Sequence, residues 1–405
     1  MIASIQKIFT KHPGFAAWTF GALLSQIGSG FSQIAIYTEL AHMGVKDSSF
    51  AYAFVVSLLP GLFSSQFGKS LAQKYRPLNL LIITEIFGAL AALIPWLGIV
   101  NHNLPLIYLG LFISSMLPGL AYPISIGLFS QVFDDNELFT TSAIQTLTFS
   151  SQVVVGQGIA ALLYSKVSID IYFFIDSFSF VLSALTMFYA GKANSLFRSH
   201  LKRIEFNPNT AFGLSDPKKI KAFFTLPILA IVGTPAISLL PAIAKNYPMF
   251  NWFGLKTESV PLFLLFKAIG QMSGALILKP NHLKHLMNHP LSLWGIILGF
   301  SALYGLTSLH IFPVFMALVF IFAAHVLSNI AFTYATSLIP QVYKGIEASR
   351  AAAVQYQAQL TSMVCIGLLT GYGADLYGIS KTILAAASIG IIALICLKYF
   401  EKSHE

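Results

Sequence analysis

The segment "LFSQVFDDNELFTTSAIQ" (residues 128–145) returns 210 positions later as "LIPQVYKGIEASRAAAVQ" (residues 338–355). Self-similarity at a fixed offset is typical of a duplicated structural unit. The offset is about half of the chain's 405 residues, so the sequence predicts two related halves. The matched positions are Gln131 with Gln341, Val132 with Val342, Phe133 with Tyr343, Glu137 with Glu347, Ala143 with Ala353 and Gln145 with Gln355.

The composition places both halves in a membrane. Hydrophobic residues make up 56% of the chain and charged residues only 10%, with a mean hydropathy of +0.74. A soluble domain needs more polar surface than this, whereas a helix that crosses a bilayer needs about 20 apolar residues. Twelve stretches meet that need: 15–40, 49–67, 79–100, 104–128, 138–164, 168–191, 221–243, 260–278, 290–309, 312–338, 349–369 and 381–397.

The long polar connection 192–220 divides these stretches into two sets of six. We therefore expect an all-α membrane protein with an N-terminal six-helix half (1–191), a cytoplasmic linker (192–220) and a C-terminal six-helix half (221–405). Lys and Arg concentrate in the connections that include both termini and the linker. Because basic loops remain on the cytoplasmic side, this bias predicts a multi-pass protein of the inner cell membrane with cytoplasmic N- and C-termini.

Two six-helix repeats joined by a long linker resemble the major facilitator superfamily of transporters, over essentially the whole chain. Within that superfamily, "YFFIDSFSFVLSAL" (172–185) and "SQIGSGFSQIAIY" (25–37) are similar to elements of the drug and siderophore exporters, which include macrolide efflux proteins and enterobactin exporters. The resemblance implies two pseudo-symmetric bundles around a central cavity. The matching residues of the sixth stretch are Phe173, Asp176, Ser179, Phe180, Ser183 and Ala184.

Two departures from the family's pattern weaken the export interpretation. The basic motif after the second stretch carries Gln73 where the superfamily has an acidic residue. The fifth stretch carries Gln157 where exporters that work by antiport have a proline. Uptake, or another form of coupling, therefore remains the alternative.

Amide side chains within the apolar stretches are candidates for lining a transport cavity. In the first stretch, Gln26 and Gln33 are seven residues apart and so share a helix face. Thr141, Gln145, Thr148 and Gln152 form a polar stripe on the fifth stretch, and Gln355 and Gln359 follow the same pattern on the eleventh. Such residues either line a water-filled path or hold neighbouring helices together, and both interpretations stay open.

Lys267 lies inside "LFLLFKAIGQMSGALIL" (262–278), the eighth stretch. A charge at the centre of a membrane helix costs about 2.5–3.5 kcal/mol on insertion scales, so it should not face lipid. His325 lies near the middle of the tenth stretch, which the resemblance places on the same side of the cavity. We predict that Lys267 and His325 attract an anionic group of the solute. The alternative is a salt bridge from Lys267 to Glu85 or Asp176.

Glu85 and Asp176 lie within the third and sixth stretches and are candidates for proton coupling. A structural role for Asp176, through hydrogen bonds to neighbouring helices, is the favoured alternative. His282, His285 and His289 lie in a basic loop without carboxylate or cysteine neighbours, so we expect no metal site there. The sequence contains no nucleotide-binding or nucleophile motif, so we expect no cofactor and no enzyme activity.

These observations predict a secondary transporter that moves a small amphipathic organic solute by alternating access. Efflux of drug-like or siderophore-like compounds is the first interpretation, and uptake of an anionic siderophore or metabolite is the second. A membrane receptor or scaffold without transport, or a lipid flippase, is a further alternative. The expected partners are the solute, which the buried lysine suggests is anionic, membrane lipids and a proton gradient; we expect no nucleic acid and a monomer.

Overall fold

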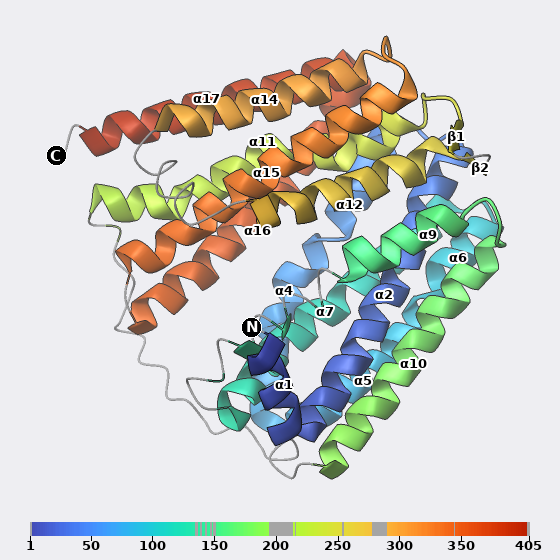
Figure 1. The fold of residues 1–405 in the computed structure, drawn as a ribbon, viewed down its shortest axis with the longest axis vertical. Helices are drawn as coiled ribbons and strands as arrows, with labels where there is room; N and C mark the ends of the chain where they lie inside the picture. The colour runs from blue at the N-terminus through green and yellow to red at the C-terminus, as the bar shows by residue number, and fades with distance from the viewer. Residues whose placement is uncertain are drawn as a thin grey trace. The chain divides into compact units, whose positions relative to one another are not determined.

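The computed structural model describes residues 2–133, 137, 140, 141, 144, 145, 148, 151–193, 214, 216–252, 255–277, 290–343 and 345–402. These residues are almost entirely helical, with one two-stranded hairpin (Figure 1). Most of the predicted linker 192–220, and His282, His285 and His289, lie outside the described residues.

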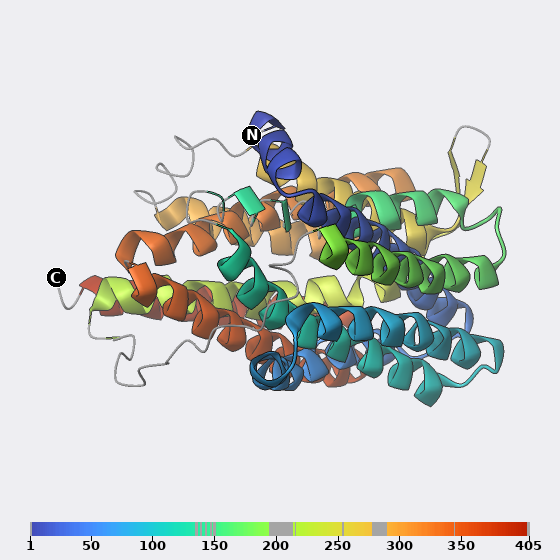
Figure 2. The same cartoon turned by 90° about the horizontal axis from the view of Figure 1, so that it is seen from below.

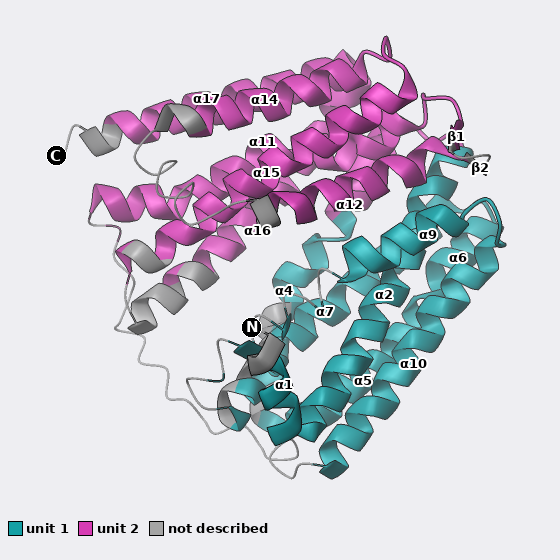
Figure 3. Cartoon of the chain, viewed as in Figure 1, with its two compact units in different colours: residues 1–43, 56–205 teal, residues 44–55, 206–405 magenta. Residues whose placement is uncertain are grey.

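The chain divides into two compact units, coloured separately in Figure 3. Unit 1 comprises residues 1–43 and 56–205. Its helices are α1 (Ile2–Lys11), α2 (Pro13–His42), α4 (Leu59–Lys74), α5 (Pro77–Ala91), α6 (Leu93–Val100), α7 (Leu104–Val132), α9 (Gln157–Leu163) and α10 (Ile169–Ala193), with a π-helical turn η1 (Gln152–Gly156).

Unit 2 comprises residues 44–55 and 206–405. The β1–β2 hairpin leads directly into α12 and lies at its N-terminal end in both views (Figures 1 and 2). The elements are α3 (Asp47–Val56), α11 (Pro217–Ala244), β1 (Phe250–Trp252), β2 (Leu255–Thr257), α12 (Ser259–Ile277), α14 (Pro290–Ser308), α15 (Val314–Val342), α16 (Gly345–Tyr377) and α17 (Ile379–Lys402).

Among the residues that the structure describes, seven helices are long and apolar enough to cross a membrane: Asp47–Ser64, Pro77–Val100, Leu104–Tyr122, Ile169–Ala193, Pro217–Ala244, Val314–Ile339 and Ile379–Tyr399. Each coincides with one of the twelve predicted stretches. The shorter apolar helices Gln152–Leu163 and Leu293–Ser308 coincide with the fifth and ninth. The first, eighth and eleventh stretches correspond to α2, α12 and α16. The predicted all-α membrane fold is confirmed, and the count of twelve stays a prediction.

A separate helix precedes the first predicted stretch, which starts at residue 15. Helix α1 ends at Lys11, and Pro13 occupies the first turn of α2, where a missing backbone N–H costs nothing. Ile8 of α1 and Phe15 and Trp18 of α2 are buried in one aromatic core of unit 1. Phe15 and Trp18 stack with ring centroids 5.8 Å apart. This packing stabilises the bend between α1 and α2.

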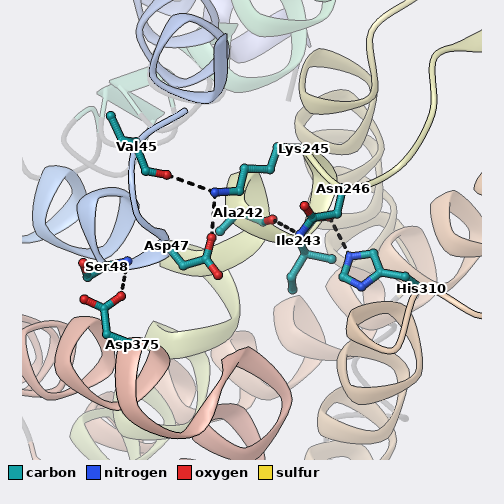
Figure 4. Close-up of polar contacts among 9 residues, drawn as sticks. All are labelled: Val45, Asp47, Ser48, Ala242, Ile243, Lys245, Asn246, His310 and Asp375. Carbon is teal, nitrogen blue, oxygen red and sulfur yellow. Dashed lines mark hydrogen bonds and ion pairs between the residues drawn. The ribbon is translucent and has the colours of Figure 1, made fainter. Parts of the chain in front are cut away.

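The segment of residues 44–55 belongs to unit 2, although the chain on both sides of it belongs to unit 1. Figure 4 shows the polar contacts at its beginning. The Lys245 ammonium group lies 2.7 Å from Asp47 Oδ1 and donates to the Val45 carbonyl oxygen at 3.0 Å. The backbone N–H of Ser48 donates to Asp375 Oδ1 at 3.4 Å. We predict one division of the chain, at the linker. That prediction says nothing of residues 44–55, which associate with the C-terminal residues.

Candidate functional site

Unit 1 contains a tight contact between α2 and α10. A Cβ atom added at Gly21 would lie 1.9 Å from Thr186 Oγ1 and 3.0 Å from the Cα of Ser183. At Gly28, an added Cβ would lie 2.8 Å from Ser179 Cβ and 3.1 Å from the Cα of Asp176. These glycines allow the two helix backbones to approach closely, as small residues do between membrane helices. We call this contact the α2–α10 seam.

Two carboxyl groups meet at this seam. Asp176 of α10 is only 4% exposed, and the Ser29 hydroxyl of α2 donates to its Oδ1 at 3.1 Å. Glu85 comes from α5, which also packs against α10. The hydroxyl groups of Ser25 and Ser183 face the Glu85 carboxyl group, which lies within electrostatic range of Asp176. The two acidic residues that we singled out in the sequence therefore both lie at this seam, within electrostatic range of each other but facing different serine hydroxyls.

A second polar contact in unit 1 joins the first and fifth predicted spans. Gln157 Nε2 donates to Gln33 Oε1 at 2.6 Å. Directly before Gln157, the helix is widened into the π-helical turn η1, and an added Cβ at Gly30 would lie 2.6 Å from the Gln152 carbonyl oxygen. Single π-helical turns are rare and are found frequently at functional sites. The turn occurs where the sequence lacks the antiporter proline.

The remaining amides of unit 1 are partly exposed. Gln26, Gln145 and Gln152 each retain some accessible surface, and their role in lining a cavity stays a prediction. Thr148 of the same fifth-span stripe is buried, and its hydroxyl donates to the Ile144 carbonyl oxygen at 2.9 Å. Thr141 is 1% exposed. In the predicted stripe, the two glutamines are therefore partly exposed and the two threonines are buried.

Unit 2 contains a corresponding contact between α12 and α15. An added Cβ at Gly270 would lie 2.5 Å from the Phe322 carbonyl oxygen and 3.0 Å from His325 Cβ. At Gly274 it would lie 2.7 Å from the Val326 carbonyl oxygen. We call this contact the α12–α15 seam. It brings Lys267, one turn before Gly270, within electrostatic range of His325.

Lys267 itself is partly exposed. Within the described parts of the chain, its ammonium group has no hydrogen-bond acceptor and no acidic partner. The predicted alternative, a salt bridge from Lys267 to Glu85 or Asp176, would join unit 2 to unit 1 and stays a prediction. A lysine at this depth keeps its charge at low cost only with an anion or water beside it.

His325 is fully buried and has a different environment from the one that we predict. Its Nε2 atom lies 2.5 Å from the Tyr304 hydroxyl of α14, and its Nδ1 atom has no hydrogen-bond partner. The Phe300 ring is also nearby, with ring centroids 6.2 Å apart. In this conformation the imidazole is buried among aromatic rings beside Lys267, and its predicted contact with a solute stays a prediction.

A pocket of about 100 Å³ lies inside unit 2, between α11, α14, α15 and α16. Gln359 and Ser328 supply polar groups to a lining that is otherwise mostly apolar, including Phe300, Ala331 and Met363. Ligand pockets for drug-sized molecules are about 300–1,000 Å³, so this space is too small for a whole solute of that size. Of the predicted cavity residues, Gln359 lines it.

Gln355, one turn before Gln359, has a packing role in this structure. It is 3% exposed, and its Nε2 donates to the carbonyl oxygens of Ala222 at 2.7 Å and Phe223 at 2.9 Å. Carbonyl oxygens near a proline in a helix lack their usual N–H donor, and Pro227 follows Phe223 by four residues in α11. Gln355 therefore supplies the missing donor, which differs from the cavity role that we predict.

Tyr304, Ser25 and Ser29 contribute to the two seams and were not predicted from the sequence. A buried tyrosine usually finds a hydrogen-bond partner, so Tyr304 within an apolar stretch is a signal that was available. The serines follow Gly21 and Gly28 on α2, and a small-residue pattern of this kind indicates a helix contact. Neither signal identifies the partner, because that depends on which helices are neighbours.

No family model matches the sequence, and no curated protein matches it significantly. Solved structures match the fold. A bacterial homologue of the iron transporter ferroportin, in an inward-facing state, has a TM-score of 0.69 at 13% identity, covering 94% of this chain and 98% of its own. A POT family transporter in complex with 5-aminolevulinic acid has a TM-score of 0.69 at 12% identity, with 95% and 96% coverage. A bacterial homologue of the lysosomal transporter Spinster, inward-facing and unoccupied, has 0.67 at 11%, with 96% of both chains covered. The chain has the fold of the major facilitator transporters.

Proposed function

We propose that the chain is a secondary transporter of the inner membrane that moves a small amphipathic organic solute carrying an anionic group. The observation that carries this proposal is Lys267, a partly exposed residue within a membrane helix whose ammonium group has no anionic partner in the described parts of the chain. An anionic group of the solute is the partner that would offset the cost of placing this charge there. One structural neighbour holds 5-aminolevulinic acid, which is itself a carboxylic acid.

Alternating access is supported by the fold, because each neighbour named above is a transporter or a transporter's homologue. Efflux of drug-like or siderophore-like compounds is our first choice of direction, on the resemblance of 172–185 and 25–37 to exporters. Uptake of an anionic siderophore or metabolite is the second, because Gln157 replaces the antiporter proline and bonds to Gln33. A receptor, scaffold or flippase would not require a solute-dependent charge pair at Lys267.

The test uses purified protein in proteoliposomes, preloaded with radiolabelled amphipathic carboxylic acids and, separately, with their primary-amide analogues. We expect counterflow of at least one acid and slower counterflow of its amide. Inverted and right-side-out membrane vesicles, with and without a proton gradient, then assign direction and coupling. Counterflow of none of the acids, or equal counterflow of acids and amides, would contradict the proposed anionic solute.

The orientation in the membrane is also a proposal. Reporter fusions after Lys11, within 192–220 and after Lys402 should all report a cytoplasmic location, because the basic residues concentrate in those connections. A fusion that reports the opposite side at any of the three positions would contradict the twelve-span topology.

A further inference from the structure

We propose that the pocket of unit 2 binds one six-membered aromatic ring that carries a hydrogen-bonding substituent, as a phenol does. The buried end of the pocket would hold the ring, and Ser328 and Gln359 at its rim would bond to the substituent. That the ring is part of the transported solute rests on the proposed function, and it narrows the solute to an amphipathic aryl acid. Binding of the ring itself is measurable without transport.

The pocket has a buried, apolar end. Ile297 and Phe300 of α14 line it and are 2% and 3% exposed. Thr234 of α11 is also buried there, but its hydroxyl already donates to the Ala230 carbonyl oxygen at 2.6 Å. A polar group placed at this end would lose its hydrogen bonds to water without replacement. The buried end therefore suits the apolar part of a ligand.

The rim of the pocket offers two polar groups. Ser328 of α15 and Gln359 of α16 line the pocket and are partly exposed. Among the residues that the structure describes, neither side chain has a hydrogen-bond partner. By contrast, the Ser337 hydroxyl of α15 donates to the Tyr334 carbonyl oxygen at 2.7 Å. A phenol hydroxyl can donate to the amide oxygen and accept from the serine, so it satisfies both groups.

The size and the neighbours of the pocket favour an aromatic ring. Its volume is about 100 Å³. A cavity of about 150 Å³ lined by Leu, Ile and Phe binds benzene, so this pocket has room for no more than one ring. Phe300, Phe332 and Met363 all line it. Aromatic rings make favourable edge contacts with other rings and with thioethers, which an alkyl group does not.

The pocket and the proposed anion site belong to the same unit. The Phe300 ring at the buried end lies beside the His325 imidazole, with ring centroids 6.2 Å apart. His325 in turn lies within electrostatic range of Lys267. A solute with an anionic group and an aryl group would therefore find a partner for each group in unit 2.

The experiment measures the binding of fluorinated probes to the purified full chain in lipid nanodiscs, from the broadening of their ¹⁹F NMR lines. The probes are 4-fluorophenol, fluorobenzene and fluorocyclohexane. Gly233→Leu is the reference variant, because Gly233 lines the pocket and the nearest atom to an added Cβ lies 3.8 Å away. A leucine side chain therefore has space to fill the pocket. Lipid dissolves each probe equally in both samples, so extra broadening with the parent measures binding in the pocket.

We expect extra broadening for both aromatic probes and none for fluorocyclohexane. Because one hydrogen bond adds little net free energy, 4-fluorophenol should bind about threefold more tightly than fluorobenzene. Gln359→Leu and Ser328→Ala should each weaken 4-fluorophenol binding about threefold and leave fluorobenzene unchanged. Gly295→Leu is the matched control: Gly295 lies on α14 outside the pocket lining, and no atom lies within 4 Å of its added Cβ. It should bind all probes as the parent does.

The thermal midpoint shows whether the reference variant folds. Gly233→Leu should raise it, because leucine favours a helix more than glycine and fills a cavity. If it lowers the midpoint, the two rim variants decide the test. Equal 4-fluorophenol broadening in the parent and a stable Gly233→Leu, equal binding of fluorocyclohexane and fluorobenzene, or unchanged 4-fluorophenol binding in both rim variants would each overturn the proposal. Probe binding without counterflow of any acid would contradict only the proposed transport function.

Discussion

The α2–α10 seam and the α12–α15 seam are built in the same way but contain opposite charges. In both, glycines bring two helix backbones together, at Gly28 in unit 1 and at Gly270 in unit 2. The first seam places Asp176 and nearby serines beside Glu85, and the second places Lys267 beside His325. The shared packing shows that close helix approach does not determine the chemistry of a seam; the polar residues placed beside the glycines do.

The two seams also differ in what surrounds the charges. Serine hydroxyl groups face both carboxyl groups, those of Ser25 and Ser183 at Glu85 and those of Ser29 and Ser32 at Asp176. Aromatic side chains surround the histidine, and Tyr304 bonds to it directly. Serine hydroxyls stabilise the buried carboxyl groups by hydrogen bonds, whereas a lysine beside a rigid aromatic group suits an anionic group of a larger solute.

The largest effect should come from substituting the seam glycines. Gly28→Val and Gly270→Val should each lower stability by about 3 kcal/mol, because the added carbons meet the backbone of the facing helix. Thermal unfolding in detergent, followed by fluorescence size-exclusion chromatography, measures this. Gly295→Val is the control, since no atom lies within 4 Å of its added Cβ. A harmless Gly270→Val beside a damaging Gly28→Val would show that the seams are not equivalent.

A smaller difference should separate the two polar clusters. Tyr304→Phe should lower stability by about 1–3 kcal/mol, because it leaves the buried His325 Nε2 without its partner. Ser183→Ala should cost less than about 1 kcal/mol, because the Ser183 hydroxyl faces the Glu85 carboxyl group without a well-formed hydrogen bond. Both variants are compared with the parent in the same thermal assay. The contrast between the clusters fails if Ser183→Ala costs as much as Tyr304→Phe.

Substitutions of the two glutamines of α16 should have different effects on stability in the same thermal assay, with a smaller difference than that between the polar clusters. Gln355→Leu should cost about 1 kcal/mol, since the Phe223 carbonyl oxygen, opposite Pro227, loses its donor and the Ala222 carbonyl oxygen loses a second hydrogen bond. Gln359→Leu should leave the thermal midpoint unchanged, because Gln359 lines a pocket and is only partly buried. If the costs of the two substitutions are reversed, the assignment of Gln355 to packing and Gln359 to the pocket is incorrect.

The smallest effect is expected at the start of the segment 44–55. Lys245→Met should cost about 0.5–1 kcal/mol, because the ion pair with Asp47 is partly exposed and such pairs contribute little. The thermal midpoint in low salt and in 1 M KCl measures the electrostatic part, which high salt should remove. A loss above about 2 kcal/mol would mean that this contact anchors residues 44–55 to unit 2 far more strongly than its exposure suggests.

Much of the fold was predictable because long apolar stretches must be helices in a membrane, and α5, α10 and α15 lie where hydropathy places them. A hydropathy pattern cannot reveal one extra residue in a helical turn, so the π-helical turn η1 was not predicted. Lys267 and Asp176 were recognisable as charges in apolar surroundings. Their neighbours were not, because Tyr304 and Ser29 lie on other helices and their contacts depend on helix pairing.

The central claim is that Lys267 binds the anionic group of the solute. The most direct measurement is counterflow of an amphipathic carboxylic acid and its amide in proteoliposomes containing equal amounts of parent, Lys267→Met, Lys267→Arg or Lys381→Met protein. Lys381 is an exposed lysine at the start of α17, and its substitution controls for the chemical change. A hydrogen bond to a charged group contributes about 1.5–3 kcal/mol, so Lys267→Met should lower kcat/KM for the acid at least tenfold. Lys267→Arg should retain more activity, and the amide should be unaffected. Equal transport of the acid by Lys267→Met and the parent would contradict the claim.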